Sequence, residues 1–236
     1  YDKIMAIKNL IDKTDYVLVG GAAANNFYQA MGIGVAGSYL DEPYVDKAKG
    51  EKVDLIKESG KLLAQYPQKI VLPIDALAAD NLDQPQKTRL VTIKPGAKLT
   101  GNWAFLDIGP KTISKYQHII KKAKTIFWDG PMGKYEDVRF RQGTLKVAEA
   151  VAENHQVPIL AGGDTAALAE DFGLIFRYTH VSIAGGAALE YLAGKPMPGI
   201  EALINSSAVP SDQPHHPALN LHPRRKNRAH LRISRL

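Results

Sequence analysis

The sequence contains no cysteine among its 236 residues. Disulfide bridges, cysteine-ligated zinc, iron–sulfur clusters and thiol catalysis are therefore excluded. The sequence also has no apolar run of the roughly eighteen residues that indicate a membrane-spanning helix, and no N-terminal pattern of a secretory signal. We therefore expect a soluble, cytoplasmic protein that does not bind membranes. The chain begins with Tyr1 rather than Met, which suggests that upstream sequence is missing.

Net positive charge is almost absent outside the C-terminal segment. The formal net charge is +6, but residues 206–236 hold six basic residues against one Asp, so residues 1–205 are almost neutral. This basic tail contains four Pro and four His but no Phe, Trp or Tyr. Proline, polar residues and like charge favour disorder. Phosphate contacts would allow nucleic-acid binding, but the tail lacks aromatic side chains for base stacking, so we favour a domain at 1–205 and a disordered tail.

Short apolar runs alternate with helical patterns along most of the chain. The runs lie at 16–19, 70–72, 106–108, 125–128, 158–161 and 181–183. Most of them are followed by apolar residues at helical spacing. This alternation predicts a doubly wound α/β fold, a three-layer sandwich in which helices cover both faces of a mainly parallel sheet. Residues 46–65 are expected to form one polar helix, and residues 79–102 an irregular section.

One local pattern occurs three times: an apolar strand, a Gly-Gly pair and the start of a helix. The pairs are Gly20–Gly21, Gly162–Gly163 and Gly185–Gly186. On one interpretation, the glycines only let helices pack closely on strands. On the other, all three turns lie at the carboxyl edge of a parallel sheet, where ligands bind and free helix amides attract phosphate.

Two further segments each allow two interpretations, one structural and one of ligand binding. Asp164 follows a Gly-Gly pair at an expected helix start, where it is either a cap or a magnesium ligand beside bound phosphate. The glycines around Asp129 and Pro131 either turn the chain or make room for a ligand. Residues 32–37 match the dinucleotide-binding pattern G-x-G-x-x-G, but they follow a helix rather than a strand, so we interpret them as a loop.

Six blocks in sequence order carry a resemblance to a known family. They are VLVGGAAANNF (17–27), LPIDALAADNL (72–82), LDIGPKTI (106–113), WDGPMGKYE (128–136), AGGDTAALAE (161–170) and HVSIAGGAALEYLAGKPMPGIEAL (180–203). Together they resemble the C-terminal, nucleotide-binding domain of phosphoglycerate kinase, from residue 1 to about residue 205. The resemblance implies a phosphotransferase of glycolysis, which moves a phosphoryl group between 1,3-bisphosphoglycerate and ADP to give 3-phosphoglycerate and MgATP.

The resemblance also implies roles for individual residues. Asp164 would hold the magnesium ion of the nucleotide, Lys3 would contact phosphate, and Glu136 would bind the ribose hydroxyls. Thr165, with the turn Gly185–Gly186, would face the phosphoryl group as the catalytic set. The other implied nucleotide-binding residues are Gly20, Gly21, Phe105, Leu106, Asp129, Pro131, Gly162, Gly163 and, again, Thr165.

Several residues depart from the family's pattern. Phe105 stands where a small residue commonly borders adenine, and Lys134 stands where an apolar residue is usual, so we expect a reshaped base pocket. Asp129 replaces an asparagine and adds negative charge near phosphate, unless magnesium or a proton compensates. Ala184 replaces a glycine, and its methyl group would obstruct the close approach of an anion.

The sequence lacks the family's N-terminal domain, whose basic cluster binds phosphoglycerate. We therefore expect a monomer that binds ADP or ATP with Mg²⁺ and meets phosphoglycerate only when that other domain is supplied. By itself, the chain should have no appreciable kinase activity. The basic residues that stabilise the negative charge of the transition state would be missing. A non-catalytic nucleotide-binding remnant or sensor is the alternative.

Overall fold

The computed structural model describes residues 2–46 and 50–207. The chain divides into two compact units, residues 1–196 (here the main unit) and residues 197–236. The second unit contains one described helix, α8 (Pro198–Ser207). The tail that we expect at 206–236 lies, beyond Ser207, outside the described residues. Among the residues that are described, no helix is both long and apolar enough to cross a bilayer.

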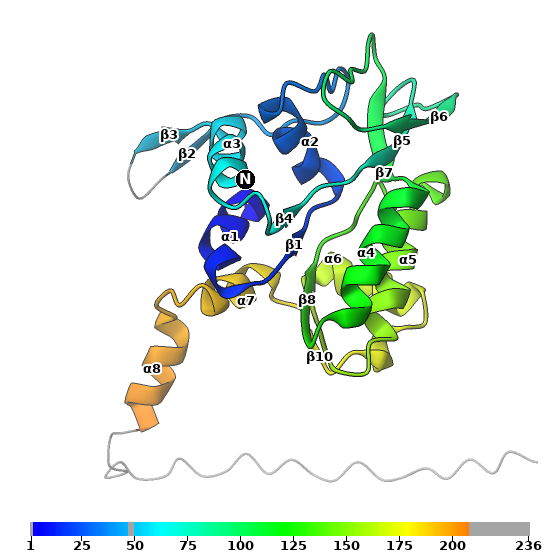
Figure 1. Cartoon of the computed structure of the whole chain (residues 1–236). Helices are drawn as coiled ribbons and strands as arrows, with labels where there is room; N and C mark the ends of the chain where they lie inside the picture. The colour runs from blue at the N-terminus through cyan, green and yellow to red at the C-terminus, as the bar shows by residue number, and fades with distance from the viewer. Residues whose placement is uncertain (1, 47–49, 208–236) are drawn as a thin grey trace, which may run out of the picture. The chain divides into compact units, whose positions relative to one another are not determined.

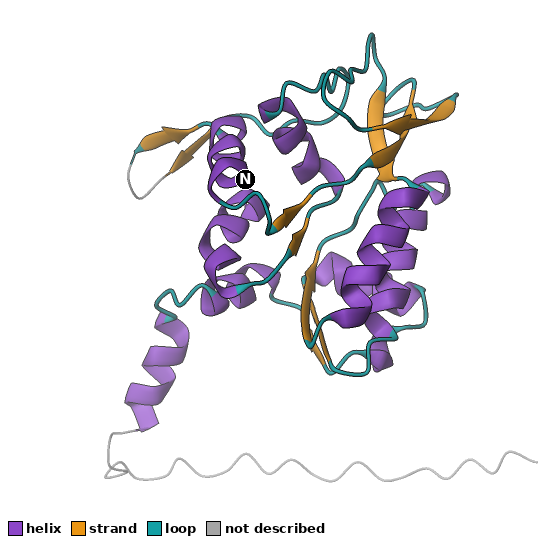
Figure 2. Cartoon of the chain, in the orientation of Figure 1, coloured by secondary structure: helices purple, strands orange, loops and turns teal. Residues whose placement is uncertain are grey.

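The main unit contains both helices and strands, and some of its strands follow one another without a helix between them, as Figures 1 and 2 show. Its helices are α1 (Asp2–Leu10), α2 (Gly21–Ala30), α3 (Leu55–Gln65), α4 (Pro110–Lys122), α5 (Gln142–Ala152), α6 (Gly163–Asp171) and α7 (Gly185–Leu192). Its strands are β1 (Val17–Leu18), β2 (Tyr44–Asp46), β3 (Glu51–Val53), β4 (Ile70–Val71), β5 (Asp75–Ala79), β6 (Thr88–Thr92), β7 (Ala104–Ile108), β8 (Thr125–Asp129), β9 (Val157–Ala161) and β10 (His180–Ser182). Short 3-10 helices lie at Ile11–Lys13, Val138–Phe140 and Ile175–Arg177.

Parallel strands carry all three Gly-Gly turns. β1 pairs with β4, and β8, β9 and β10 form a sheet in the order β10-β9-β8. Asp129, Ala161 and Ser182 are in register across that sheet, so the last residues of its three strands lie side by side. The predicted α/β fold with parallel strands and helices is confirmed, and so is the order strand, Gly-Gly turn, helix.

Antiparallel strands appear in two segments where the sequence led us to expect otherwise. The section at 79–102 was expected to be irregular but contains β6, which pairs with β5 in a sheet of order β6-β5-β7. The segment 46–65 was expected to be one helix, but β2 and β3 pair across its start. Helix α3 begins only at Leu55, where the Asp54 carboxylate caps the amide of Lys57. Strand pairing and this cap outweigh the polar helical pattern.

Two apolar clusters form most of the core. One joins α4, α5 and α6 to β8 and β9 around Tyr116, Trp128 and Leu160. The other joins α1, α2 and α3 to β1 and β4. In the described part of the chain, no ladder of hydrogen bonds links β1 to β8, so the parallel strands form two sheets rather than one. The Tyr116 hydroxyl lies 2.6 Å from the Val19 carbonyl oxygen and 2.9 Å from that of Val71, which ties α4 to both strands of the smaller sheet.

Candidate functional site

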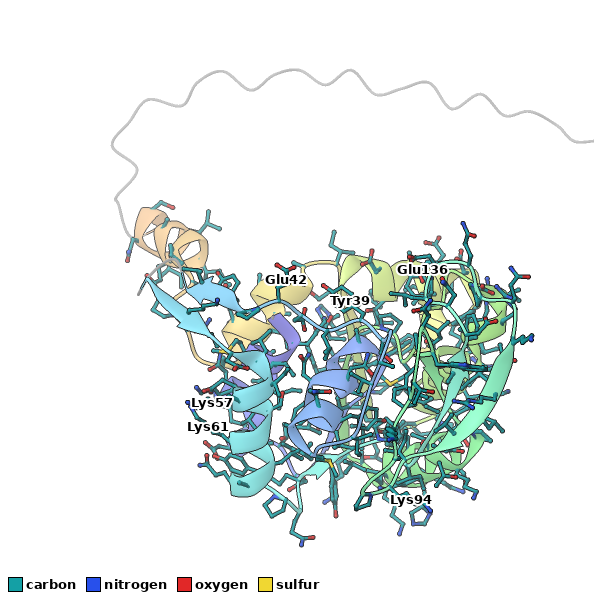
Figure 3. All side chains as sticks on the ribbon, turned by 90° about the horizontal axis from the view of Figure 1, so that it is seen from above. Tyr39, Glu42, Lys57, Lys61, Lys94 and Glu136 are labelled. Carbon is teal, nitrogen blue, oxygen red and sulfur yellow. The ribbon has the colours of Figure 1, made fainter. Side chains whose placement is uncertain are left out.

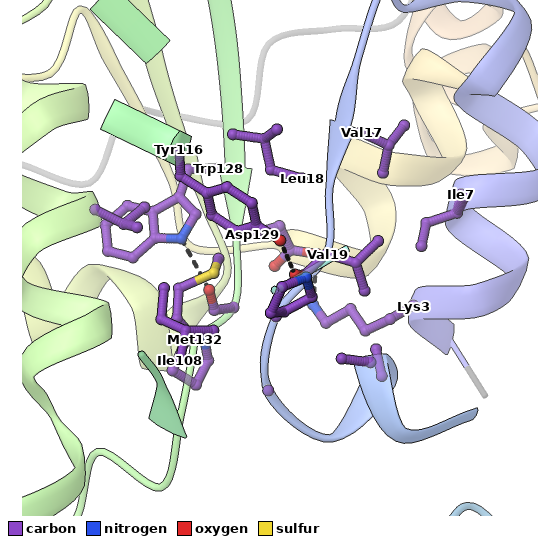
Figure 4. A pocket seen from close by; sticks show the side chains of 18 of the residues that line it. Lys3, Ile7, Val17, Leu18, Val19, Ile108, Tyr116, Trp128, Asp129 and Met132 are labelled. Atoms are coloured by element: carbon purple, nitrogen blue, oxygen red, sulfur yellow. Dashed lines mark hydrogen bonds and ion pairs between the residues drawn. The ribbon is translucent and has the colours of Figure 1, made fainter. Parts of the chain in front are cut away.

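A cavity of about 1720 Å³ lies between β1 and β8 and extends to the turns that follow them (Figure 4). Its wall includes eight of the residues to which the resemblance assigned nucleotide binding: Lys3, Gly20, Gly21, Phe105, Leu106, Asp129, Pro131 and Glu136. Figure 3 marks Glu136 and Tyr39, both of which line this cavity. Folding therefore brings together residues that come from α1, the β1–α2 turn, β7, β8 and the loop after β8.

The loop after β8 is held by the elements on either side of it. The Gly21 amide donates a 2.9 Å hydrogen bond to the Met132 carbonyl oxygen, which joins the loop to the start of α2. The Met132 amide donates to Thr144 Oγ1 of α5 at 3.0 Å. At Gly20, an added Cβ would lie 2.4 Å from Met132 Sδ, so glycine permits the close approach of turn and loop.

Phe105 and Lys134, the residues expected to reshape the base pocket, both line the cavity. The Phe105 ring meets the Tyr28 ring edge to face, with 5.6 Å between centroids. The Lys134 amide donates to the Leu106 carbonyl oxygen at 2.7 Å, and its ammonium donates to the Leu82 carbonyl oxygen at 2.6 Å. The Lys134 side chain is therefore bound to a backbone carbonyl, and Phe105 packs on a second aromatic ring.

The remaining predicted site residues lie at the ends of β9 and β10, and they are not among the described residues that line the cavity: Gly162, Gly163, Asp164, Thr165, Gly185 and Gly186. These turns touch each other and the end of β8. The Gly162 amide donates to the Ser182 carbonyl oxygen at 2.9 Å, and the Gly130 amide donates to Thr165 Oγ1 at 2.9 Å. Gly162 has a φ of 95°, which a side chain would disfavour.

Asp129 lies where these turns meet. A Cβ added at Gly162 would lie 2.8 Å from Asp129 Oδ1, and one added at Gly185 would lie 3.2 Å from it. The other carboxylate oxygen, Oδ2, is 2.5 Å from Lys3 Nζ. Figure 4 shows Lys3 extending from α1 toward Asp129. The charge that was expected to need magnesium or a proton is therefore balanced by a lysine of this chain.

Asp164 and Glu136 both act electrostatically on Tyr135, a cavity residue that the sequence reasoning missed. Burial raises the pKa of the Tyr135 phenol above its usual value, and the negative charges of Glu136 and Asp164 raise that pKa further. This coupling indicates that Asp164 lies near the loop that carries Tyr135 and Glu136. The only sequence signal for Tyr135 was its position beside Glu136.

The exposed carboxylate of Asp164 fits a magnesium ion that is shared with a nucleotide. Within residues 2–46 and 50–207, no group of three or more His, Asp or Glu could hold a metal by itself. Mg²⁺ in proteins usually keeps several waters and takes one or two carboxylates together with substrate phosphate oxygens. One carboxylate at the start of α6 matches that donor set if phosphate supplies the other oxygens.

Asp107 of β7, a second residue missed from the sequence, lines the cavity and supports the loop after β8. It is 5% exposed, and its carboxylate accepts hydrogen bonds of 2.8 Å from the amides of Ile108 and Gly143. Burial raises its pKa to about 7, although these amides act in the opposite direction. Asp107 thus holds the start of α5, from which Thr144 holds the loop after β8. An acidic residue inside an apolar strand was the available signal.

Residues 1–195 match the family model described as phosphoglycerate kinase. The chain belongs to the phosphoglycerate kinase family. The phosphoglycerate kinase of Thermosipho africanus is 40% identical over 211 residues, which cover 88% of this chain and 50% of that protein. That of Pseudothermotoga lettingae is 39% identical over 204 residues, covering 86% and 49%.

Solved structures of phosphoglycerate kinases share the fold. The structure from Coxiella burnetii matches with a TM-score of 0.71 and 35% identity, over 85% of this chain and 49% of that chain. The structure from Pyrococcus horikoshii matches with a TM-score of 0.72 and 29% identity, over 87% and 49%. The chain therefore spans about half the length of the phosphoglycerate kinases that it resembles.

Proposed function

We propose that the chain is the nucleotide-binding half of a phosphoglycerate kinase and binds ADP and ATP together with Mg²⁺. The observation that carries this proposal is the cavity, whose wall gathers eight residues assigned to nucleotide binding. The Gly-Gly turns follow parallel strands, at the edge where open α/β sheets bind ligands. The helix dipoles at the starts of α2, α6 and α7 favour phosphate there.

Each part of a nucleotide has candidate partners. The nucleoside would be bordered by residues of the β1–α2 turn, β7 and the loop after β8: Gly20, Gly21, Phe105, Leu106 and Pro131. Glu136, exposed on that loop, would accept hydrogen bonds from the ribose hydroxyls. Asp164 would hold the magnesium ion, which neutralises phosphate charge. Lys3, Asp129, Thr165 and the glycines of the 162–163 and 185–186 turns would surround the phosphates.

The reaction of the family divides between two substrates. An oxygen of the terminal ADP phosphate would form a bond to the phosphorus of the acyl phosphate, while the bond from phosphorus to the acyl oxygen breaks. Such a transfer depends mainly on in-line positioning and on neutralising charge. This chain would supply the nucleotide side, so we expect phosphoglycerate binding and turnover to require the half of the family's length that the chain does not span.

Isothermal titration calorimetry of ADP, with and without Mg²⁺, tests nucleotide binding. The wild-type chain should bind ADP more tightly when Mg²⁺ is present. Asp164→Ala should lose about tenfold or more of this magnesium-dependent affinity, because one direct metal ligand is removed. Asp171→Ala is the matched control, since Asp171 is an exposed carboxylate at the other end of α6. Failure of the wild-type chain to bind millimolar ADP would refute the proposal.

A coupled assay separates the enzyme half from a non-catalytic nucleotide-binding protein. The purified chain alone should show no appreciable formation of ATP from 1,3-bisphosphoglycerate and ADP. Addition of a separately produced N-terminal half from a phosphoglycerate kinase should restore measurable turnover, and Asp164→Ala should abolish it. Nucleotide binding with no turnover in the mixture would favour the non-catalytic alternative.

A further inference from the structure

The ion pair between Lys3 and Asp129 has unequal burial. The Asp129 side chain is 9% exposed, whereas that of Lys3 is 49% exposed. The carboxylate is enclosed by the turns that contain Gly162 and Gly185, and Lys3 also lies over Gly130, where an added Cβ would come within 3.6 Å of its ammonium. Asp129 is therefore a fixed charge, while Lys3 reaches it from the solvent side on a flexible side chain.

This arrangement penalises an approaching phosphate in two ways. A phosphate placed at the 162–163 or 185–186 turn would lie close to the buried negative charge of Asp129, and charges are poorly screened in such a site. The same phosphate would have to compete with Asp129 for the Lys3 ammonium. A magnesium ion on the phosphates reduces both penalties, because it cancels much of their negative charge before they reach Asp129.

We propose that Asp129 makes this site selective for the magnesium complex of a nucleotide over the free nucleotide. It does so by holding Lys3 in the ligand-free protein and by repelling phosphate whose charge no metal neutralises. The inference rests on the proposed nucleotide binding and adds a specificity-determining residue to it. Asp129 acts here as a fixed charge beside the phosphates, and Asp164 carries the metal.

The first experiment compares the affinities for ADP and for its magnesium complex by calorimetry. Asp129→Asn keeps the shape of the side chain but removes its charge. This variant should bind free ADP about tenfold more tightly and the magnesium complex nearly as the wild type does, so that selectivity falls. Lys3→Gln leaves the negative charge of Asp129 without its ion-pair partner. This variant should therefore show a higher selectivity for the magnesium complex over free ADP. Glu149→Gln, which breaks the Lys146–Glu149 pair on α5, is the charge-matched control and should change neither affinity.

The second experiment needs no nucleotide. Limited acetylation followed by peptide mass spectrometry reports how accessible each amine is, and ion pairing with a buried carboxylate shields Lys3. Asp129→Asn should raise the acetylation rate of Lys3 several-fold relative to Lys8, which lies on the same helix and pairs with Glu58. Lys8 is the internal reference, and its rate should not change.

The outcomes separate this inference from the proposed function. If neither ADP form binds to any variant, the proposed function fails and this inference fails with it. If ADP binds but Asp129→Asn keeps or increases the selectivity for the magnesium complex, only the role of Asp129 is refuted. An unchanged acetylation rate of Lys3 in Asp129→Asn would also refute it. If Asp129→Asn does not fold, Lys3→Gln supplies the test. A selectivity for the magnesium complex that is unchanged or reduced in Lys3→Gln would then refute the role of Asp129.

Discussion

Thr165 Oγ1 accepts a 2.9 Å hydrogen bond from the Gly130 amide and thereby joins the first turn of α6 to the turn after β8. Thr165 is 1% exposed, so no water competes for this bond. Asp129 directly precedes Gly130, and Asp164 directly precedes Thr165. The bond therefore fixes the spacing of the two carboxylates to which we assign phosphate selectivity and metal binding.

Thr165→Val should lower the free energy of unfolding by about 1–3 kcal/mol, because it leaves the partly buried Gly130 amide without its hydrogen-bond partner. Urea unfolding at 25 °C measures this change. Thr165→Ser keeps the oxygen and should retain most of the stability. A larger loss in Thr165→Ser than in Thr165→Val would show that the methyl group of Thr165, rather than its hydroxyl, supports the turn.

Gly185→Ala and Gly186→Ala form a matched pair on adjacent residues. A Cβ at Gly185 would lie 2.8 Å from the Cα of Gly162, so the variant must displace backbone and should be destabilised by about 1–3 kcal/mol. A Cβ at Gly186 meets nothing within 4 Å. Alanine at that helical position should leave thermal unfolding unchanged or raise the stability by up to about 1 kcal/mol. A larger loss in Gly186→Ala than in Gly185→Ala would contradict this.

Asp107→Asn should flatten the dependence of stability on pH. The pKa of Asp107 is raised to about 7 in the folded chain, above the value near 3.9 expected in the unfolded chain. The folded state therefore binds a proton more tightly, and this stabilising contribution is full below about pH 4 and is lost as the pH rises through 7.

Unfolding of the wild type and of Asp107→Asn between about pH 5 and pH 8 measures this effect. The free energy of unfolding of the wild type minus that of Asp107→Asn should fall as the pH rises. The fall should be at most about 1.4 kcal/mol per pH unit, which is the limit for the exchange of one proton. Asp137→Asn is the control, because Arg139 lowers the pKa of Asp137 to about 2 and no proton is exchanged in that range. A flat difference for Asp107→Asn would indicate that its carboxyl is ionised throughout.

Tyr116→Phe should weaken the attachment of α4 to the smaller parallel sheet. The Val71 carbonyl oxygen keeps a 3.1 Å hydrogen bond from the Val19 amide, but the Val19 carbonyl oxygen loses its 2.6 Å bond from the hydroxyl. We expect a loss of about 1–2 kcal/mol in urea unfolding. Unchanged stability would mean that packing of the Tyr116 ring, and not its hydroxyl, joins these elements.

The sequence by itself determined the local units and the family. Each strand, Gly-Gly turn and helix start is encoded within about a dozen neighbouring residues, because apolar runs, glycine and helix formers act locally. The six motif blocks indicated the family for the same reason. The resemblance also implied that Asp164, Glu136 and Lys3 bind the nucleotide, and these roles stay predictions.

Tertiary structure decided which of these units meet. The pairing of β2 with β3 and of β6 with β5 overrode the helix and the irregular section expected there. Asp129 is 126 positions from Lys3, and Thr165 is 35 positions from Gly130, so no local pattern encodes either contact. Such contacts depend on how the apolar faces of distant elements pack, and they fix the charge that a bound phosphate would encounter.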